Sequence, residues 1–275
     1  MTIQAELAAI KAKAETYNNG AMLQLAFSCI DLTTLNPTDT VSHVKAFTQR
    51  VNDFANDYPT LPNVAAICVH PNMVRSVKEV LNVDSVNIAA VAGGFPGSMT
   101  FIDIKVKEAA MAVDFGANEI DIVLSLWAFL EGDKLICTEE IATIKDTIGS
   151  AHLKVILETG ALLEPEKIHH ASMLSMEAGA DFIKTSTGKM SPAATPEAAI
   201  VMCRAIKEYW MKTGKKIGFK PAGGIVTTED AILYLSIVKE ILGEEWLTPE
   251  LFRIGASRLA NNLLSDMLGE EIKYF

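Results

Sequence analysis

The chain has 275 residues, of which 49% are hydrophobic and 21% charged, and its formal net charge is −10. That length and apolar content suit one large domain with a substantial buried core. The negative charge argues against a nucleic-acid partner and against an anionic membrane surface, and it means that an anionic substrate needs a local positive pocket.

The four cysteines are far apart in the sequence and form no C-x-x-C motif; they are Cys29, Cys68, Cys137 and Cys203. No signal peptide and no apolar run of membrane-spanning length is apparent in the sequence. We therefore expect a cytoplasmic protein with reduced thiols and no membrane association.

Short apolar runs alternate along the chain with longer amphipathic segments. Eight apolar runs are predicted strands, at 23–35, 64–71, 86–96, 119–126, 153–160, 181–188, 216–224 and 251–257. The segments between them are predicted helices, at 40–56, 71–82, 99–115, 133–149, 164–178, 195–213, 227–242 and 258–268. Residues 1–20 are predicted to form an extra helical extension, with its helix over 2–18, and residues 269–275 a flexible tail.

Continuous apolar strands that alternate with helices are typical of a parallel sheet covered on both faces. Eight such units favour a (β/α)8 TIM barrel, an α/β fold, built as a single domain over residues 1–275. A doubly wound open sheet is the alternative. No linker, low-complexity segment or block of like charge indicates a second domain.

Polar side chains gather in and after the predicted strands, and in a TIM barrel the active site lies at the carboxyl ends of the strands. Strand residues alternate between the two faces, and the apolar set must face the helices. Asp121, Lys184 and Lys220 then point into the mouth of the barrel, whereas a register slip of one residue would reverse that orientation.

Two inward lysines on neighbouring strands predict an amine with a lowered pKa, because like charges disfavour the ammonium form of one of them. A neutral lysine is a nucleophile toward carbonyl groups, and a carboxylate beside it can move protons. Lys184, Lys220 and Asp121 therefore fit Schiff-base chemistry. The alternative is an ion network that only holds the strands together.

Glycines and hydroxyls follow the last three predicted strands, in "TSTGK" (185–189), "PAGG" (221–224) and "GAS" (255–257). Phosphate sites of TIM barrels are often built at this place from backbone N–H groups and a helix N-terminus. Ordinary turn glycines are the alternative for any one position. The predicted phosphate-binding residues are Thr187, Gly188, Lys189, Gly223, Gly224 and Ser257.

Seven segments, in order along nearly the whole chain, resemble the deoxyribose-phosphate aldolase family. They are "DLTTLN" (31–36), "AAICVHP" (65–71), "EIDIVL" (119–124), "LKVILETG" (153–160), "FIKTSTG" (182–188), "GFKPAGG" (218–224) and "RIGAS" (253–257). The resemblance implies a class I, metal-free and cofactor-free lyase on a (β/α)8 barrel. Its reaction is the reversible cleavage of 2-deoxy-D-ribose 5-phosphate to acetaldehyde and D-glyceraldehyde 3-phosphate, a step of deoxyribonucleotide catabolism.

The resemblance also implies roles for individual residues. Lys184 forms the Schiff base, Lys220 perturbs its pKa, and Asp121 donates and accepts protons. Asp31 and Cys68 match positions that line the substrate site. Family members are often dimers, and a homodimer is expected on that ground alone.

The sequence departs from the family pattern at three positions. Ala161 follows "ETG" where many members have an acidic residue. Arg258 stands where a small or hydroxyl residue is usual in the phosphate site, and it either reaches the phosphate or faces away on its helix. Some members close the site with a C-terminal tyrosine, whereas here the chain ends Tyr274-Phe275, so Tyr274 is a weak candidate for that role.

The five histidines suggest no metal site, because His169 and His170 point about 100° apart on a helix and the others lie in separate units. A zinc-dependent aldolase is therefore not expected. Two further hypotheses stay open beside deoxyribose-phosphate aldolase. One is a related class I aldolase with another substrate preference, and the other is a catalytically silent phosphosugar-binding barrel.

Overall fold

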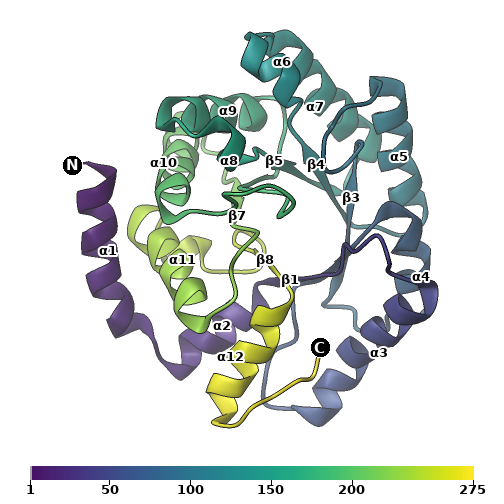
Figure 1. The fold of residues 1–275 in the computed structure, drawn as a ribbon, viewed down its shortest axis with the longest axis vertical. Coiled ribbons are helices and arrows are strands. Elements are labelled where there is room, and N and C mark those ends of the chain that lie inside the picture. The colour runs from purple at the N-terminus through teal and green to yellow at the C-terminus, as the bar shows by residue number, and fades with distance from the viewer. Residues whose placement is uncertain (1) are drawn as a thin grey trace.

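A computed structural model describes residues 2–275 and has eight parallel strands arranged as a barrel inside a ring of helices (Figure 1). The hydrogen-bonded order is β7-β6-β5-β4-β3-β2-β1-β8. Bridges from Phe219 to Phe252 and from Ala222 to Gly255 join β7 to the β8 side. The strands are β1 (Ile30–Thr33), β2 (Ala66–Val69), β3 (Asn87–Ala92), β4 (Glu119–Val123), β5 (His152–Ile156), β6 (Phe182–Lys184), β7 (Gly218–Lys220) and β8 (Ile254–Ala256).

This order confirms the predicted TIM barrel and rules out the open sheet. The helices outside it are α1 (Ile3–Tyr17), α2 (Gly20–Ser28), α3 (Val41–Asp57), α4 (Val74–Lys78), α5 (Ile102–Asp114), α6 (Leu126–Glu131), α7 (Lys134–Ile148), α8 (Thr159–Leu162), α9 (Pro165–Glu177), α10 (Pro196–Thr213), α11 (Thr228–Ile241) and α12 (Arg258–Leu268). Two short 3-10 helices, η1 (Pro71–Met73) and η2 (Glu244–Trp246), complete the set. No helix between residues 2 and 275 is long and apolar enough to cross a membrane.

The helices begin where the sequence supplies a side chain for the free N–H groups of the first turn. Thr40, Thr195 and Thr227 each accept a hydrogen bond from the backbone N–H three residues later, at the starts of α3, α10 and α11. At Thr227 the bond is reciprocated by Asp230, which forms a capping box. Such caps fix the helix starts and therefore the lengths of the loops that follow the strands.

The inside of the barrel has two different walls. Small apolar side chains of β2 and β3 form a separate cluster with Leu35, made of Ala66, Cys68, Ala89 and Val91. The opposite wall, formed by β1 and by β4 to β8, carries buried charged side chains. The outward residues Ile120, Ile183 and Phe219 belong to the main core under the helices, as alternation predicted.

Three sequence predictions of local structure are wrong or incomplete. Residues 23–28 were expected to start the first strand, but they belong to α2, whose first turn is capped by the Asn19 side chain. The whole apolar run is buried in either form, so hydrophobicity alone does not separate helix from strand there. The helix predicted at 71–82 is only η1 followed by α4, and the short helices α6 and α8 were not predicted.

The two ends of the chain lie against the barrel. Helix α1 packs on α10 and α11, outside the ring (Figure 1). The last residues run back from α12 toward α3, where the N–H groups of Tyr274 and Phe275 donate to the side chain of Asn261 at 2.9 and 3.0 Å. The tail is thus held by specific contacts in this structure, and its flexibility in solution stays a prediction.

Gly218 in β7 provides a test of barrel packing. A Cβ at this position would lie 2.2 Å from the Phe182 ring of β6, which is buried and has no free space to move into. Gly218→Ala is expected to lower the free energy of unfolding by about 1–3 kcal/mol, as overpacking of cores does. Denaturant titration followed by circular dichroism measures it.

Gly20→Ala is the matched control, because nothing lies within 4 Å of a Cβ there and the position opens α2. Alanine is the better helix former, so this variant should be as stable as the parent or slightly more so. Equal stability of both variants would contradict the packing argument.

Candidate active site

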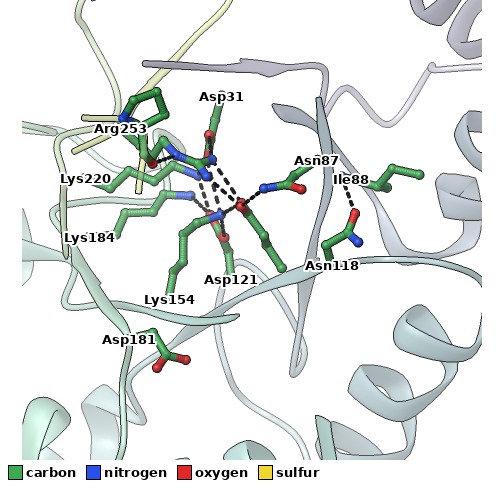
Figure 2. Close-up of polar contacts among 12 residues, drawn as sticks. Asp31, Asn87, Ile88, Asn118, Asp121, Lys154, Asp181, Lys184, Lys220 and Arg253 are labelled. Carbon is green, nitrogen blue, oxygen red and sulfur yellow. Dashed lines mark hydrogen bonds and ion pairs between the residues drawn. The ribbon is translucent and has the colours of Figure 1, made fainter. Parts of the chain in front are cut away.

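The charged wall of the barrel brings seven ionisable side chains into contact. They come from six strands and from the residue that precedes β8, and all are buried; they are Asp31, Glu119, Asp121, Lys154, Lys184, Lys220 and Arg253. Figure 2 shows the three lysines converging on Asp121. The parallel register makes this possible, because Lys184 of β6 lies directly beside Lys220 of β7.

Asp121 is the centre of the predicted catalytic set. Its Oδ2 accepts hydrogen bonds from the Nζ of Lys184 and from the Nζ of Lys220, both at 2.7 Å. Its Oδ1 accepts from Lys154 at 3.1 Å. The structure therefore brings together the three residues that the sequence singled out, with the inward orientation that alternation predicted.

A second layer lies beneath this set, farther from the carboxyl ends of the strands. Arg253 donates to Asp31 at 2.7 Å and makes two bonds to Glu119, at 2.7 and 3.1 Å. Lys154 bonds to Glu119 and lies 3.2 Å from Asp31, and Lys220 bonds to Asp31. The bidentate geometry is one that only a guanidinium provides.

The pKa of Lys184 is lowered from its ordinary value. Burial is the largest cause; the Asp121 carboxylate opposes it, and the Lys220 ammonium lowers the pKa further. For Lys220 burial also favours the neutral form, but Asp121 and Asp31 outweigh it, so its pKa is raised. Lys184 is thus the lysine that most readily becomes a neutral amine, in agreement with the sequence prediction.

The carboxyl groups respond in the opposite sense. Burial alone would raise the pKa of Asp121, yet the ammonium groups of Lys154, Lys184 and Lys220 hold it well below its ordinary value. Asp121 is therefore ionised at neutral pH and can accept a proton but not donate one until it has received it.

A cavity of about 470 Å³ opens above Lys184 at the carboxyl ends of the strands. Lys184 lines it, and so do Arg50, Lys189, Arg258 and His43, while no Asp or Glu side chain is among its described lining residues. In a chain of net charge −10, this is the local positive pocket that an anionic substrate needs.

The predicted phosphate-binding residues gather on one side of this cavity, at its β6–β8 end. All six line it: Thr187, Gly188, Lys189, Gly223, Gly224 and Ser257. Gly223 has a φ of +89° and approaches Gly188 so closely that a Cβ would lie 3.0 Å from the Gly188 Cα. The backbone of the two loops therefore meets at this point, and α12 begins beside it.

Asp31 and Cys68, which the resemblance placed at the substrate, lie deeper in the barrel and do not line the cavity. Asp31 is fully buried among Lys154, Lys220 and Arg253. Cys68 belongs to the apolar wall, and burial raises the pKa of its thiol. A contact of either side chain with substrate stays a prediction.

Three members of the network were not predicted as site residues, namely Glu119, Lys154 and Arg253. Glu119 lies two positions before Asp121 in β4, so alternation puts it on the same inward face. Lys154 stands between Leu153 and Val155 in β5, the same signal that marked Lys184. Arg253 carries no such signal, because it precedes β8 and pairs with residues distant in sequence.

Glu158 fixes the loop after β6. This residue is 2% exposed and has a φ of +53°, an unusual conformation for a side chain other than glycine. Its carboxylate accepts bonds from the Thr187 N–H at 3.2 Å and from the Thr187 hydroxyl at 2.5 Å. The Thr187 hydroxyl oxygen in turn accepts from the Lys189 N–H at 3.0 Å, so Glu158 shapes the predicted phosphate loop.

The two C-terminal residues and Arg258 occupy distinct places. The Tyr274 hydroxyl donates to Asp57 at 2.7 Å and does not line the cavity, whereas Phe275 does. The side chain that closes the mouth at this edge is thus the last residue and not the tyrosine. Arg258 lines the cavity, which places it with the predicted phosphate residues.

Comparison with known proteins agrees with this geometry. A sequence profile of the DeoC/LacD family aldolases matches residues 25–241. The chain belongs to this family. It is 44% identical to the deoxyribose-phosphate aldolase of Homo sapiens over 253 residues, which is 88% of this chain and 80% of that protein.

Two further similarities extend this result. The deoxyribose-phosphate aldolase of Bos taurus is 43% identical over 249 residues, covering 87% of this chain and 78% of the relative. A solved structure described as "QR15, an Aldolase" superimposes with a TM-score of 0.72 at 30% identity, covering 88% of this chain and 96% of that one. The family aldolases thus share both sequence and barrel with this chain.

Thr187→Val tests the contact that shapes the loop. The change leaves the buried Glu158 carboxylate with the Thr187 N–H alone and removes the acceptor of the Lys189 N–H. We expect the free energy of unfolding to fall by about 1–3 kcal/mol, the cost of leaving buried polar groups unsatisfied. Denaturant unfolding measures the change.

Thr147→Val is the control, because that exposed hydroxyl only bonds back to the Thr143 carbonyl of its own helix. It should change stability by less than about 0.5 kcal/mol. A Thr187 variant as stable as this control would show that the Glu158 contact contributes little.

Proposed function

We propose that this chain is a deoxyribose-phosphate aldolase that reversibly cleaves 2-deoxy-D-ribose 5-phosphate to acetaldehyde and D-glyceraldehyde 3-phosphate. One observation carries the proposal: Lys184, the lysine with the lowered pKa, is at the base of a cavity lined with cations. The names of the relatives at 43–44% identity support the substrate.

The first step is formation of the Schiff base. The neutral Lys184 amine attacks the C-1 aldehyde of the open-chain sugar, and loss of water gives an iminium ion. Asp121 accepts a hydrogen bond from the Lys184 nitrogen at 2.7 Å, so it holds the amine in place. Lys220 shares the same carboxylate oxygen and favours the uncharged form of Lys184 by repulsion.

The second step breaks the C2–C3 bond, because C-1 and C-2 become acetaldehyde. Asp121 takes the proton of the C-3 hydroxyl across one water, and the electron pair of the C2–C3 bond moves into the iminium to give an enamine. The C-3 carbon leaves as the aldehyde of glyceraldehyde 3-phosphate. The same proton returns to C-2, and water then hydrolyses the iminium to release acetaldehyde and the free amine.

The iminium itself serves as the electron sink, so no step of this route uses a metal or a cofactor. The phosphate of the substrate is bound by the N–H groups of Gly188, Gly223 and Gly224 with the side chains of Lys189 and Ser257. Lys189 donates to the Leu35 carbonyl at 2.7 Å, which holds its charge at the rim of the cavity.

The remaining parts of the proposal concern the setting of the protein. We propose that it works in the cytoplasm, in deoxyribonucleotide catabolism, as a homodimer, with no nucleic-acid or membrane partner. A related aldolase with another substrate preference is the second candidate, because Arg258 adds a charge to the cavity where family members usually have a small residue.

Trapping with acetaldehyde and borohydride tests the amine chemistry. Reduction of the Schiff base leaves an ethyl group on the reacting lysine, and peptide mass spectrometry should find it on Lys184. Lys184→Ala should form no adduct and lose essentially all turnover, because no other amine lines the base of the cavity among the described residues. Lys167→Ala, an exposed helix lysine, is the control and should behave as wild type.

No adduct in a folded sample would favour the silent binding barrel, and an adduct on Lys220 would reverse the two lysine roles. Turnover of 2-deoxyribose 5-phosphate by the wild type completes the assignment. Adduct formation without that turnover would favour the second candidate.

Arg258→Ser tests the phosphate side of the cavity. If Arg258 binds the phosphate, its loss should raise the KM for 2-deoxyribose 5-phosphate about 10-fold or more, the effect of a charge-assisted hydrogen bond of 1.5–3 kcal/mol. The KM for unphosphorylated 2-deoxyribose should stay the same. Equal changes for both substrates would mean that the arginine does not read the phosphate.

A further inference from the structure

The buried network has a particular charge balance. It contains three carboxylates, and without Lys184 it contains three cations, so these six groups sum to zero; they are Asp31, Glu119, Asp121, Lys154, Lys220 and Arg253. A proton on Lys184 would add one unpaired positive charge inside the barrel. An uncompensated buried charge is costly, so the balance itself favours the neutral amine.

The contacts decide which cation is the one in excess. Lys154 lies within 4 Å of three carboxylates, and Lys220 and Arg253 each contact two. Lys184 contacts Asp121 alone and borders the cavity, and its side chain is 4% exposed. Removing its proton therefore sacrifices the least attraction.

Arg253 and Glu119 belong to this balance although neither lines the cavity. Arg253 reaches Lys184 only through other groups, by way of Asp31, Lys220 and then Asp121. Its bidentate pair with Glu119 holds two opposite charges at the bottom of the network. Asn87 also donates to Glu119, at 2.8 Å, and orients that carboxylate.

We propose that Arg253 and Glu119 are positioning residues that keep the Lys184 amine unprotonated by fixing the net charge of the buried network. This inference rests on the proposed function, since it concerns the same amine. Every strand that faces Lys184 has been included: β1, β4, β5 and β7 supply the charged groups, β2 supplies the thiol of Cys68, and the described inward residues of β3, Ala89 and Val91, do not ionise.

The proposal makes opposite predictions for the two residues. Arg253→Met removes a cation and leaves the other groups with one negative charge in excess, so Lys184 retains its proton to higher pH. Glu119→Gln removes an anion and leaves a positive excess, so Lys184 loses its proton at lower pH. In the double variant the network is neutral again without Lys184, and the wild-type behaviour should return.

The test is the pH dependence of the rate at which each folded protein is trapped by acetaldehyde and cyanoborohydride on Lys184. The acid limb of the rate profile should move up by about one pH unit or more in Arg253→Met and down by a similar amount in Glu119→Gln, the size of shift that one close charge produces. The double variant should lie near the wild type. A purely structural role would not move the two limbs in opposite directions.

Failure of this inference can be distinguished from failure of the proposed function. If wild-type Lys184 is never trapped, the proposed function is wrong. If it is trapped but neither single change moves the limb, or both move it the same way, the network rebalances on a carboxylate and the inference is wrong. Should Arg253→Met not fold, Glu119→Gln and the double variant still decide the sign.

Discussion

The structure depends on one electrostatic constraint: the carboxylates inside the barrel must each be paired, because a lone buried charge costs several kcal/mol. Each of Asp31, Glu119 and Asp121 contacts at least two cations. The pairing links six of the eight barrel positions, so it ties strands that are far apart in sequence. A protein that removed one partner would lose both packing and chemistry, which makes the reactive amine inseparable from the fold.

The division of the barrel interior follows from the same constraint. Small apolar residues of β2 and β3 fill one wall, and they leave room for the long lysine and arginine side chains that cross from the other. A second buried cation, Lys105, is kept outside this network. It bonds to Ser98, Ser125 and Glu140 at 2.7–2.9 Å and joins the loops after β3 and β4. The loop beyond Asp121 is thereby fixed without altering the charge around Lys184.

The sequence predicted the barrel and the central trio because both follow from short-range rules. Period-2 alternation orients Asp121, Lys184 and Lys220 within their own strands, and strand ends of a parallel barrel meet by topology. Glu119 and Lys154 obey the same rules and could have been included. Arg253 could not, since its partners Asp31 and Glu119 are 222 and 134 positions away. Likewise, the start of β1 was misplaced because α2 is as apolar as the strand it precedes.

The cations at the cavity rim have a second consequence for the proposed reaction. A phosphate dianion that entered a neutral cavity would stabilise a proton on any nearby amine and would thereby inhibit the attack of Lys184. Here Lys189 and Arg258 stand at the phosphate side, and Arg50 lies on the same cavity. These side chains offset the charge of the phosphate where it binds, so the balance beneath Lys184 is not disturbed by the substrate. Rim and network are thus complementary: one accommodates an anion, and the other keeps the amine uncharged while the anion is present.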